Sequence, residues 1–96
     1  MYNASATYEE NYKNGPNPLF LQGGKFPVVK YTEKPRYEFL GIPLHIPFGV
    51  AAGPLLNAAY VRAALNAGFC LPTYKTVRSR VWECNKWPNI LAINSN

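Results

Sequence analysis

The stretch that decides the fold is FGVAAGPLLNAAYVRAALNAGFCLPTYKT, residues 48–76. It opens with a short apolar run, Phe48–Ala51, bounded by turn residues, which is typical of a strand buried on both faces. A helix is predicted over Ala58–Ala67, with Asn57 as its N-cap and Gly68 where a left-handed residue ends a helix. The next apolar run, Phe69–Tyr74, predicts a second strand. The stretch therefore indicates a right-handed strand–helix–strand crossover.

Two details of this unit can be checked in a structure. The predicted helix carries Tyr60, Val61, Ala64 and Leu65 on one face, so this apolar face is expected to point inward. Pro72 is unfavourable in the second strand, because proline has no N–H to donate to a neighbouring strand.

The whole chain divides into two parts. Residues 36–96 are predicted to form the folded domain, which starts with a hairpin of strands at Tyr37–Leu40 and Leu44–Ile46 around a turn. Residues 1–35 are rich in Asn, Tyr, Lys, Gly and Pro, with turn signals at Asn14-Gly15-Pro16. They are predicted to be an irregular lead-in with a short strand at Val28–Tyr31.

The composition is that of a folding chain. Apolar residues make up 48% and charged residues 16% of 96 residues, which excludes a disordered tail. The length falls short of the roughly 250 residues that a closed eight-stranded α/β barrel needs. The net charge of +5 suits phosphate groups, anionic substrates or nucleic acid, but the basic residues form no run, which weakens a nucleic-acid or membrane-surface interpretation.

The cysteines and the hydropathy pattern argue against metal-binding, secreted and membrane-spanning classes of protein. Cys70 and Cys84 have no CxxC spacing, so two reduced thiols are expected and no metal site is predicted. The sequence contains no apolar run of the roughly 18 residues that a membrane span needs, and the polar start does not resemble a signal peptide. We therefore expect a soluble cytoplasmic protein.

Candidate functional residues follow the two predicted strands. In parallel α/β folds the carboxyl ends of the strands hold the site. Ala51, Ala52 and Gly53 end the first strand, and their small side chains let backbone N–H groups approach a flat ring or an oxyanion. Lys75 and Thr76 end the second strand and offer a positive charge and a hydroxyl. Both ends should face one side and form an anion or cofactor site.

Other polar and aromatic residues have weaker functional interpretations. His45 lies in the hairpin, away from this site, and is expected to be structural. Arg78 and Arg80 are either phosphate contacts or solvated loop residues. Trp82 and Trp87 are expected to pack a loop that covers the site, with stacking on a ligand as the alternative.

Several motifs, taken in order, resemble the start of FMN-dependent dihydroorotate dehydrogenases and related barrels. They are PFGVAAG (47–53), GFCLPTYKTVRSR (68–80), WPN (87–89) and AINSN (92–96), and Lys75 follows Gly53 by 22 positions, as in that family. The resemblance implies an α/β fold, the N-terminal portion of a (β/α)8 TIM barrel that is incomplete in this chain. It also implies a flavoprotein oxidoreductase of pyrimidine biosynthesis.

The resemblance assigns roles to particular residues. FMN would be bound by Ala51, Ala52, Gly53, Lys75 and Thr76, while the substrate would contact Lys75, Asn94 and Ser95. The general base lies downstream in the family, so no catalytic base is expected within these residues. The quinone-using branch has a lysine in the turn where this chain has Leu56, so the chain is similar to the soluble branch.

The resemblance also indicates which partners to expect, and two alternative functions remain beside it. The expected partner is a small-molecule substrate, dihydroorotate or a similar pyrimidine, with a homodimer for the full-length protein and no nucleic acid or membrane. As a fragment, this chain alone is expected to be inactive. Two alternatives stay open: another dihydropyrimidine-type FMN barrel, and a small basic nucleic-acid-binding module in which Arg78, Arg80 and the tryptophans contact the ligand.

Overall fold

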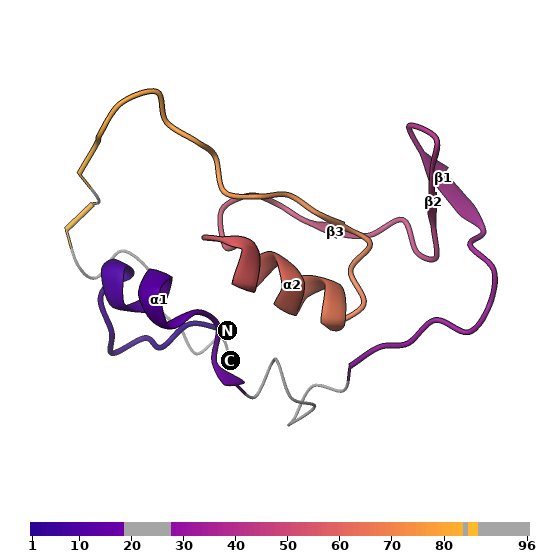
Figure 1. Cartoon of the computed structure of the whole chain (residues 1–96), viewed down its shortest axis with the longest axis horizontal. Helices are drawn as coiled ribbons and strands as arrows, with labels where there is room; N and C mark the ends of the chain where they lie inside the picture. The colour runs from indigo at the N-terminus through magenta and orange to yellow at the C-terminus, as the bar shows by residue number, and fades with distance from the viewer. Residues whose placement is uncertain (19–27, 84, 87–96) are drawn as a thin grey trace, which may run out of the picture.

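The protein is a small mixed α/β structure with two separate two-stranded sheets. A computed structural model describes residues 1–18, 28–83 and 85–86. Figure 1 shows α2 in the middle beside β3, with α1 at one end and the β1–β2 hairpin at the other. In chain order the elements are α1 (Tyr8–Asn14), β1 (Tyr37–Phe39), β2 (Ile42–Leu44), β3 (Gly49–Val50), α2 (Ala58–Asn66) and β4 (Leu71–Pro72).

The predicted strand–helix–strand unit is confirmed, with shorter strands than expected. β3 and β4 pair in parallel, and Val50 lies opposite Pro72. The backbone N–H groups of Leu71 and Thr73 donate to the carbonyls of Phe48 and Val50, at 3.3 and 2.8 Å. Since alternate residues of a strand face the same partner, the nitrogen of Pro72 faces away from β3. Proline is tolerated there because that position has no hydrogen bond to donate.

Gly49 allows the two parallel strands to approach. A Cβ atom built on Gly49 would lie 2.2 Å from the carbonyl oxygen of Leu71, well inside van der Waals contact. The obstructing atom belongs to the backbone, so a side-chain rotation cannot relieve the clash. The strand pairing therefore requires glycine at this position.

The ends of α2 are the predicted ones to within a residue. The Asn57 side chain accepts from the backbone N–H groups of Ala59 and Tyr60, at 3.0 and 3.4 Å, which confirms it as the N-cap. Gly68 has a φ of 97°, which confirms the left-handed residue after the helix. The helix ends at Asn66, because Ala67 is its C-cap.

The hydrophobic core lies where α2 meets the turn that follows β3. Leu55, Leu56, Tyr60 and Ala64 form one buried cluster, and each buried leucine contributes about 1.5–3 kcal/mol relative to an exposed one. Tyr60 and Ala64 are on the predicted inner face. Leu65 was wrongly placed there: it is 48% exposed, and Ala63 is fully buried instead.

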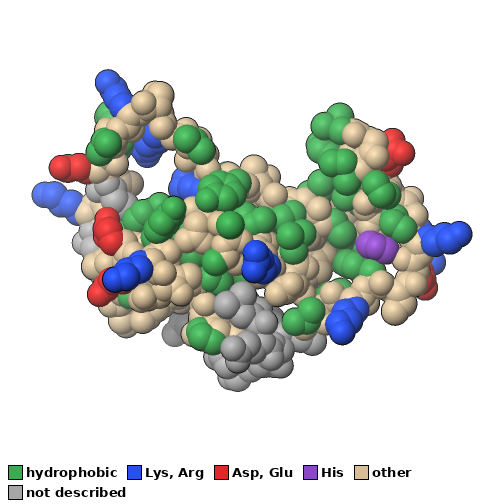
Figure 2. Space-filling view, viewed as in Figure 1, with side chains coloured by type: hydrophobic (Ala, Val, Ile, Leu, Met, Phe, Trp, Pro, Cys, Tyr) green, Lys and Arg blue, Asp and Glu red, His purple; other side chains and the backbone are tan. Residues whose placement is uncertain are grey.

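The predicted hairpin is confirmed, but its second strand is Ile42–Leu44 and not Leu44–Ile46, so the turn is tighter than expected. In the antiparallel pair, Phe39 lies opposite Ile42, so only Leu40 and Gly41 form the turn. Both have positive φ, at 50° and 79°, as in the type I′ turns that match strand twist. Figure 2 shows hydrophobic side chains gathered on this hairpin, and Leu40 is 86% exposed.

The expected irregular lead-in contains a helix that the sequence analysis missed. The capping box at the start of α1 pairs Thr7 with Glu10: the Glu10 backbone N–H donates to the Thr7 hydroxyl, and the Thr7 N–H donates to the Glu10 carboxylate. The Thr7 N–H and the Thr7 hydroxyl both donate to the Glu10 carboxylate and hold the pKa of that carboxyl below its usual range. The spacing T-x-x-E signals such a cap in the sequence.

The lead-in packs directly onto the strand–helix–strand unit. The rings of Tyr2 and Tyr60 stack with centroids 5.1 Å apart, and the Tyr2 hydroxyl donates to the Pro54 carbonyl. The Tyr60 hydroxyl donates to the Asn11 carbonyl at 2.8 Å. Residues 1–14 are therefore part of the packed body, although the division at residue 35 stays a prediction.

The predicted strand at Val28–Tyr31 is wrong. The Val29 backbone N–H donates to the carbonyl of Asn66 at 2.8 Å, which attaches this segment to the end of α2 and not to a strand. Among the described residues, no helix has the length and apolar character required to cross a lipid bilayer.

Candidate functional site

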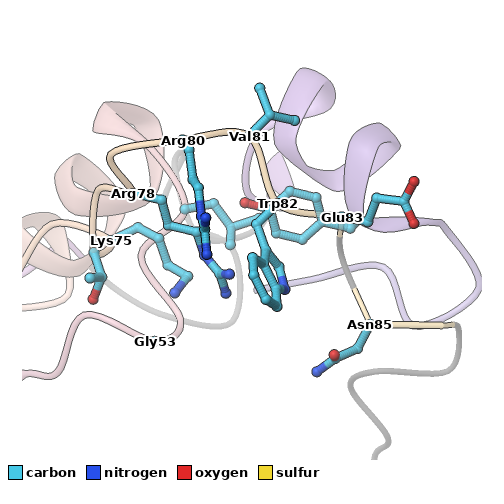
Figure 3. A pocket seen from close by; sticks show the side chains of 11 residues that line it. Gly53, Lys75, Arg78, Arg80, Val81, Trp82, Glu83 and Asn85 are labelled. Carbon is cyan, nitrogen blue, oxygen red and sulfur yellow. The ribbon is translucent and has the colours of Figure 1, made fainter.

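A cavity of about 590 Å³ lies at the carboxyl ends of the two parallel strands. Its volume is in the range of small-molecule sites, which is about 300–1,000 Å³. Figure 3 shows it between the turn after β3, the chain after β4, and the start of α1. The lining residues are Tyr8, Gly53, Leu56, Lys75, Thr76, Arg78, Arg80, Val81, Trp82, Glu83 and Asn85.

The structure brings Gly53, Lys75 and Thr76 to this cavity, as the sequence predicts from their positions at the two strand ends. The Lys75 backbone N–H donates to the Leu55 carbonyl at 3.0 Å, which ties the chain after β4 to the turn after β3. A Cβ atom on Gly53 would meet no atom within 4 Å. The backbone at Gly53 is therefore open to a ligand.

Ala51 and Ala52 precede Gly53 and are outside the lining of the cavity. The Ala52 carbonyl accepts from the backbone N–H of Leu55 at 3.3 Å, which closes the turn after β3. Their contact with a ligand stays a prediction. The other two predicted binding residues, Asn94 and Ser95, lie outside the described residues, as do Trp87 and Cys84.

The segment 77–83, which we call the arm, supplies the far wall of the cavity. The guanidinium carbons of Arg78 and Arg80 each lie 5.5 Å from the centroid of the Trp82 ring. Guanidinium groups at this distance are attracted by the negative face of the indole. Trp82 lines the cavity and contacts both arginines, while its expected role in packing a loop over the site stays a prediction.

The cavity has a positive electrostatic character. Lys75, Arg78 and Arg80 line it, against the single carboxylate of Glu83. Lys75 is half-buried, whereas both arginines are exposed. Positive charge gathered in a concave, partly desolvated site attracts anions more strongly than the same charge on a flat surface.

His45 lies away from this cavity, as expected, and has a structural contact. Its ring stacks on Tyr31 with centroids 4.4 Å apart and an angle of 3° between the planes. The Tyr31 hydroxyl donates to the Gly68 carbonyl. Cys70 is a free thiol. Within the described part of the chain, no group of three His, Cys, Asp or Glu side chains could hold a metal ion.

Sequence analysis missed one element of the site, the start of α1. Tyr8 is the first residue of this helix and lines the cavity, from a segment expected to be an irregular lead-in. The capping box could have indicated a helix there. Its approach to a cavity some 70 positions away in sequence depends on the packing of Tyr2 against Tyr60, which has no local signal.

Comparison with known proteins adds one match. The sequence is 42% identical, over 96 residues, to a protein of Dictyostelium discoideum named dihydroorotate dehydrogenase. The match covers 98% of this chain and 25% of that relative, so the chain spans about a quarter of the length of the curated relative that it matches. No protein-family model and no solved structure matches the sequence.

Proposed function

We propose that this chain, which belongs to the dihydroorotate dehydrogenase family, supplies part of the cofactor and substrate pocket of an FMN-dependent oxidoreductase that converts dihydroorotate to orotate. The observation that carries the proposal is the meeting of Gly53, Lys75 and Thr76 in one cavity at the ends of two parallel strands. The 42% identity to the Dictyostelium discoideum protein supports the same reaction.

The architecture proposed for the full-length protein is a (β/α)8 barrel. β3 and β4 would be its first two strands, because they are parallel and are joined through a helix, as successive strands of such barrels are. The hairpin β1–β2 precedes them. In such barrels the carboxyl ends of the strands carry the active site, which is where the cavity lies.

The residues around the cavity fit a flavin. Gly53 leaves open space where a Cβ would stand, so a flat ring can approach its backbone. Thr76 offers a hydroxyl, and Lys75 offers a positive charge from a half-buried position. FMN, when bound, would accept a hydride from the substrate. Ala51 and Ala52 would complete the surface beneath it.

Lys75 is the residue with the clearest electrostatic role. An ammonium group placed between cofactor and substrate stabilises negative charge on either one, and it orients a substrate carboxylate. Asn94 and Ser95 would hydrogen-bond the pyrimidine ring. The base that removes the substrate proton would come from another part of the full-length protein.

We further propose a cytoplasmic protein that acts on a small molecule, forms a homodimer when full length, and has no nucleic-acid or membrane partner. The distribution of basic side chains bears on the nucleic-acid partner alone: Figure 2 shows Lys and Arg spread over both ends of the visible face. A nucleic-acid-binding surface concentrates them in one patch or stripe.

The test is orotate formation by the FMN-loaded full-length protein that carries this sequence. Replacement of Lys75 by Ala is expected to lower the rate by about 10²–10³-fold, as the loss of one preorganised charge does. Lys13→Ala, on α1 and outside the cavity, is the matched control and should retain the rate. A wild-type protein that leaves dihydroorotate unchanged would contradict the proposal.

The 96-residue chain alone is expected neither to hold FMN tightly nor to turn over, because the strands described here cannot close a barrel. Titration of FMN with the purified chain should leave the flavin fluorescence unquenched. Tight, quenching binding by the isolated chain would show that the cofactor site is complete within these residues.

A further inference from the structure

We propose that Arg78 and Arg80, held on the ring of Trp82, select substrates that carry a carboxylate over neutral dihydropyrimidines. This inference rests on the proposed function and names the substrate class of the same cavity. It separates dihydroorotate, which carries a carboxylate, from the neutral dihydropyrimidines that related barrels use.

The first support is the shared aromatic ring. Both guanidinium carbons lie 5.5 Å from the same ring centroid, so they are at most 11 Å from one another. Figure 3 shows both arginine side chains on the same side of the Trp82 indole, directed into the cavity together with Lys75. Attraction to the face of an indole holds a guanidinium near the ring and leaves its N–H groups free to donate.

The second support is that neither arginine is paired with a carboxylate, although Glu83 lines the same cavity. Among residues 1–18, 28–83 and 85–86, neither arginine forms an ion pair. Arg36, by contrast, pairs with Glu33 at 2.6 Å, although both of those side chains are largely exposed. Two like charges near one ring repel each other, and an anion between them removes that repulsion.

The third support is the chemistry of recognition. A guanidinium stays charged at any physiological pH and donates two parallel hydrogen bonds that match a carboxylate. A neutral ring without a carboxylate gains nothing from such groups and must still displace their water. The arrangement therefore discriminates by charge, while the rest of the cavity binds the ring.

The experiment compares two ligands that differ only in the carboxylate, orotate and uracil. Their dissociation constants are measured by titration of the flavin absorbance in the FMN-loaded full-length protein. The double variant Arg78→Gln/Arg80→Gln is expected to weaken orotate binding at least about tenfold, the loss of one charge-assisted hydrogen bond or more. Uracil binding should change by less than about twofold, because it lacks the group that the arginines recognise.

Arg62→Gln is the control, because Arg62 is exposed on α2 and is not among the lining residues. It should leave both ligands unchanged. Trp82→Phe keeps an aromatic face and should retain most of the preference for orotate, whereas Trp82→Leu should lose much of it. This contrast separates a role in positioning the arginines from a role in packing alone.

Three results would overturn the inference. In the double variant, equal weakening of orotate and uracil would mean a general disturbance of the cavity, and unchanged orotate binding would mean that the arginines do not contact the carboxylate. Loss of bound FMN with an unchanged orotate-to-uracil ratio would assign the arginines to the cofactor phosphate. A wild-type protein that prefers orotate yet does not oxidise dihydroorotate would instead refute the proposed function alone.

Discussion

The strand–helix–strand unit and the arm meet at one cavity but differ in what holds them. In the unit, Tyr60 and Leu55 are completely buried. In the arm, Val77 is 85% exposed and Val81 is 97% exposed. The unit is stabilised by removal of apolar surface from water, whereas the arm leaves both valines in water and has its arginines against the Trp82 ring.

This difference indicates a division of roles. Ligand-binding segments are drawn from the less stable parts of a protein, because they must exchange water for ligand and adjust to it. A rigid unit can place Gly53 and Lys75 with fixed geometry, while the arm presents Arg78 and Arg80 from an exposed backbone. Mutations in the unit should therefore change stability, and mutations in the arm should change binding with little effect on stability.

The largest effect is expected for Tyr60→Ala in the unit. It removes a fully buried ring and its stack with Tyr2, and such truncations cost about 3–5 kcal/mol. In a chain of this size, that loss should abolish cooperative unfolding in urea. Tyr60→Phe should cost only about 1 kcal/mol, since it removes one hydrogen bond to the Asn11 carbonyl, which also accepts from Gly15. Cooperative unfolding retained by Tyr60→Ala would show that the core lies elsewhere.

Gly49→Ala should have the next largest effect. The added methyl group meets the Leu71 carbonyl oxygen at 2.2 Å, and overpacking of this kind costs about 1–3 kcal/mol. Gly53→Ala is the matched control for stability, because its methyl group meets open space and should cost less than about 0.5 kcal/mol. Both are read from urea denaturation midpoints. Equal losses for the two variants would contradict the close approach of β3 and β4.

A smaller effect is expected for Tyr2, which joins the lead-in to the unit, and it should appear at alkaline pH. Burial, with smaller contributions from Tyr60 and Tyr8, raises the pKa of Tyr2 to about 12 from the ordinary value of 10. The folded state holds the Tyr2 proton more tightly than the unfolded state does. The contribution of Tyr2 to the free energy of unfolding is therefore complete below pH 10 and is lost as the pH rises to 12. Tyr2→Phe should remove this part of the pH dependence. The check is the difference in unfolding free energy between wild type and variant at pH 9 to 12.

The smallest effect is expected in the arm itself. Val81→Ser replaces a side chain that is 97% exposed and should change the unfolding free energy by less than about 0.5 kcal/mol. A thermal unfolding scan beside wild type measures it. A loss comparable to that of Gly49→Ala would mean that the arm is packed and would remove the contrast between the two regions.

Local patterns predicted the unit well. The apolar run before Gly53, the Asn57 cap and the terminal Gly68 each depend on interactions within a few residues, so their sequence signals are strong. The hairpin was predicted for the same reason, although its turn proved to be two residues. Leu65 was misplaced because helical periodicity gives the width of an apolar face but not its centre, which depends on what packs there.

The sequence by itself determined the order of strand, helix and strand, and with it the meeting of Gly53, Lys75 and Thr76 at one edge of a parallel pair. Parallel strands joined by a short helix leave no other arrangement, because their carboxyl ends point the same way. Only the tertiary structure decided that Tyr8 would reach the cavity and that Arg78 and Arg80 would share one indole. Those contacts depend on side-chain packing between segments whose relative positions have no periodic or spacing signal.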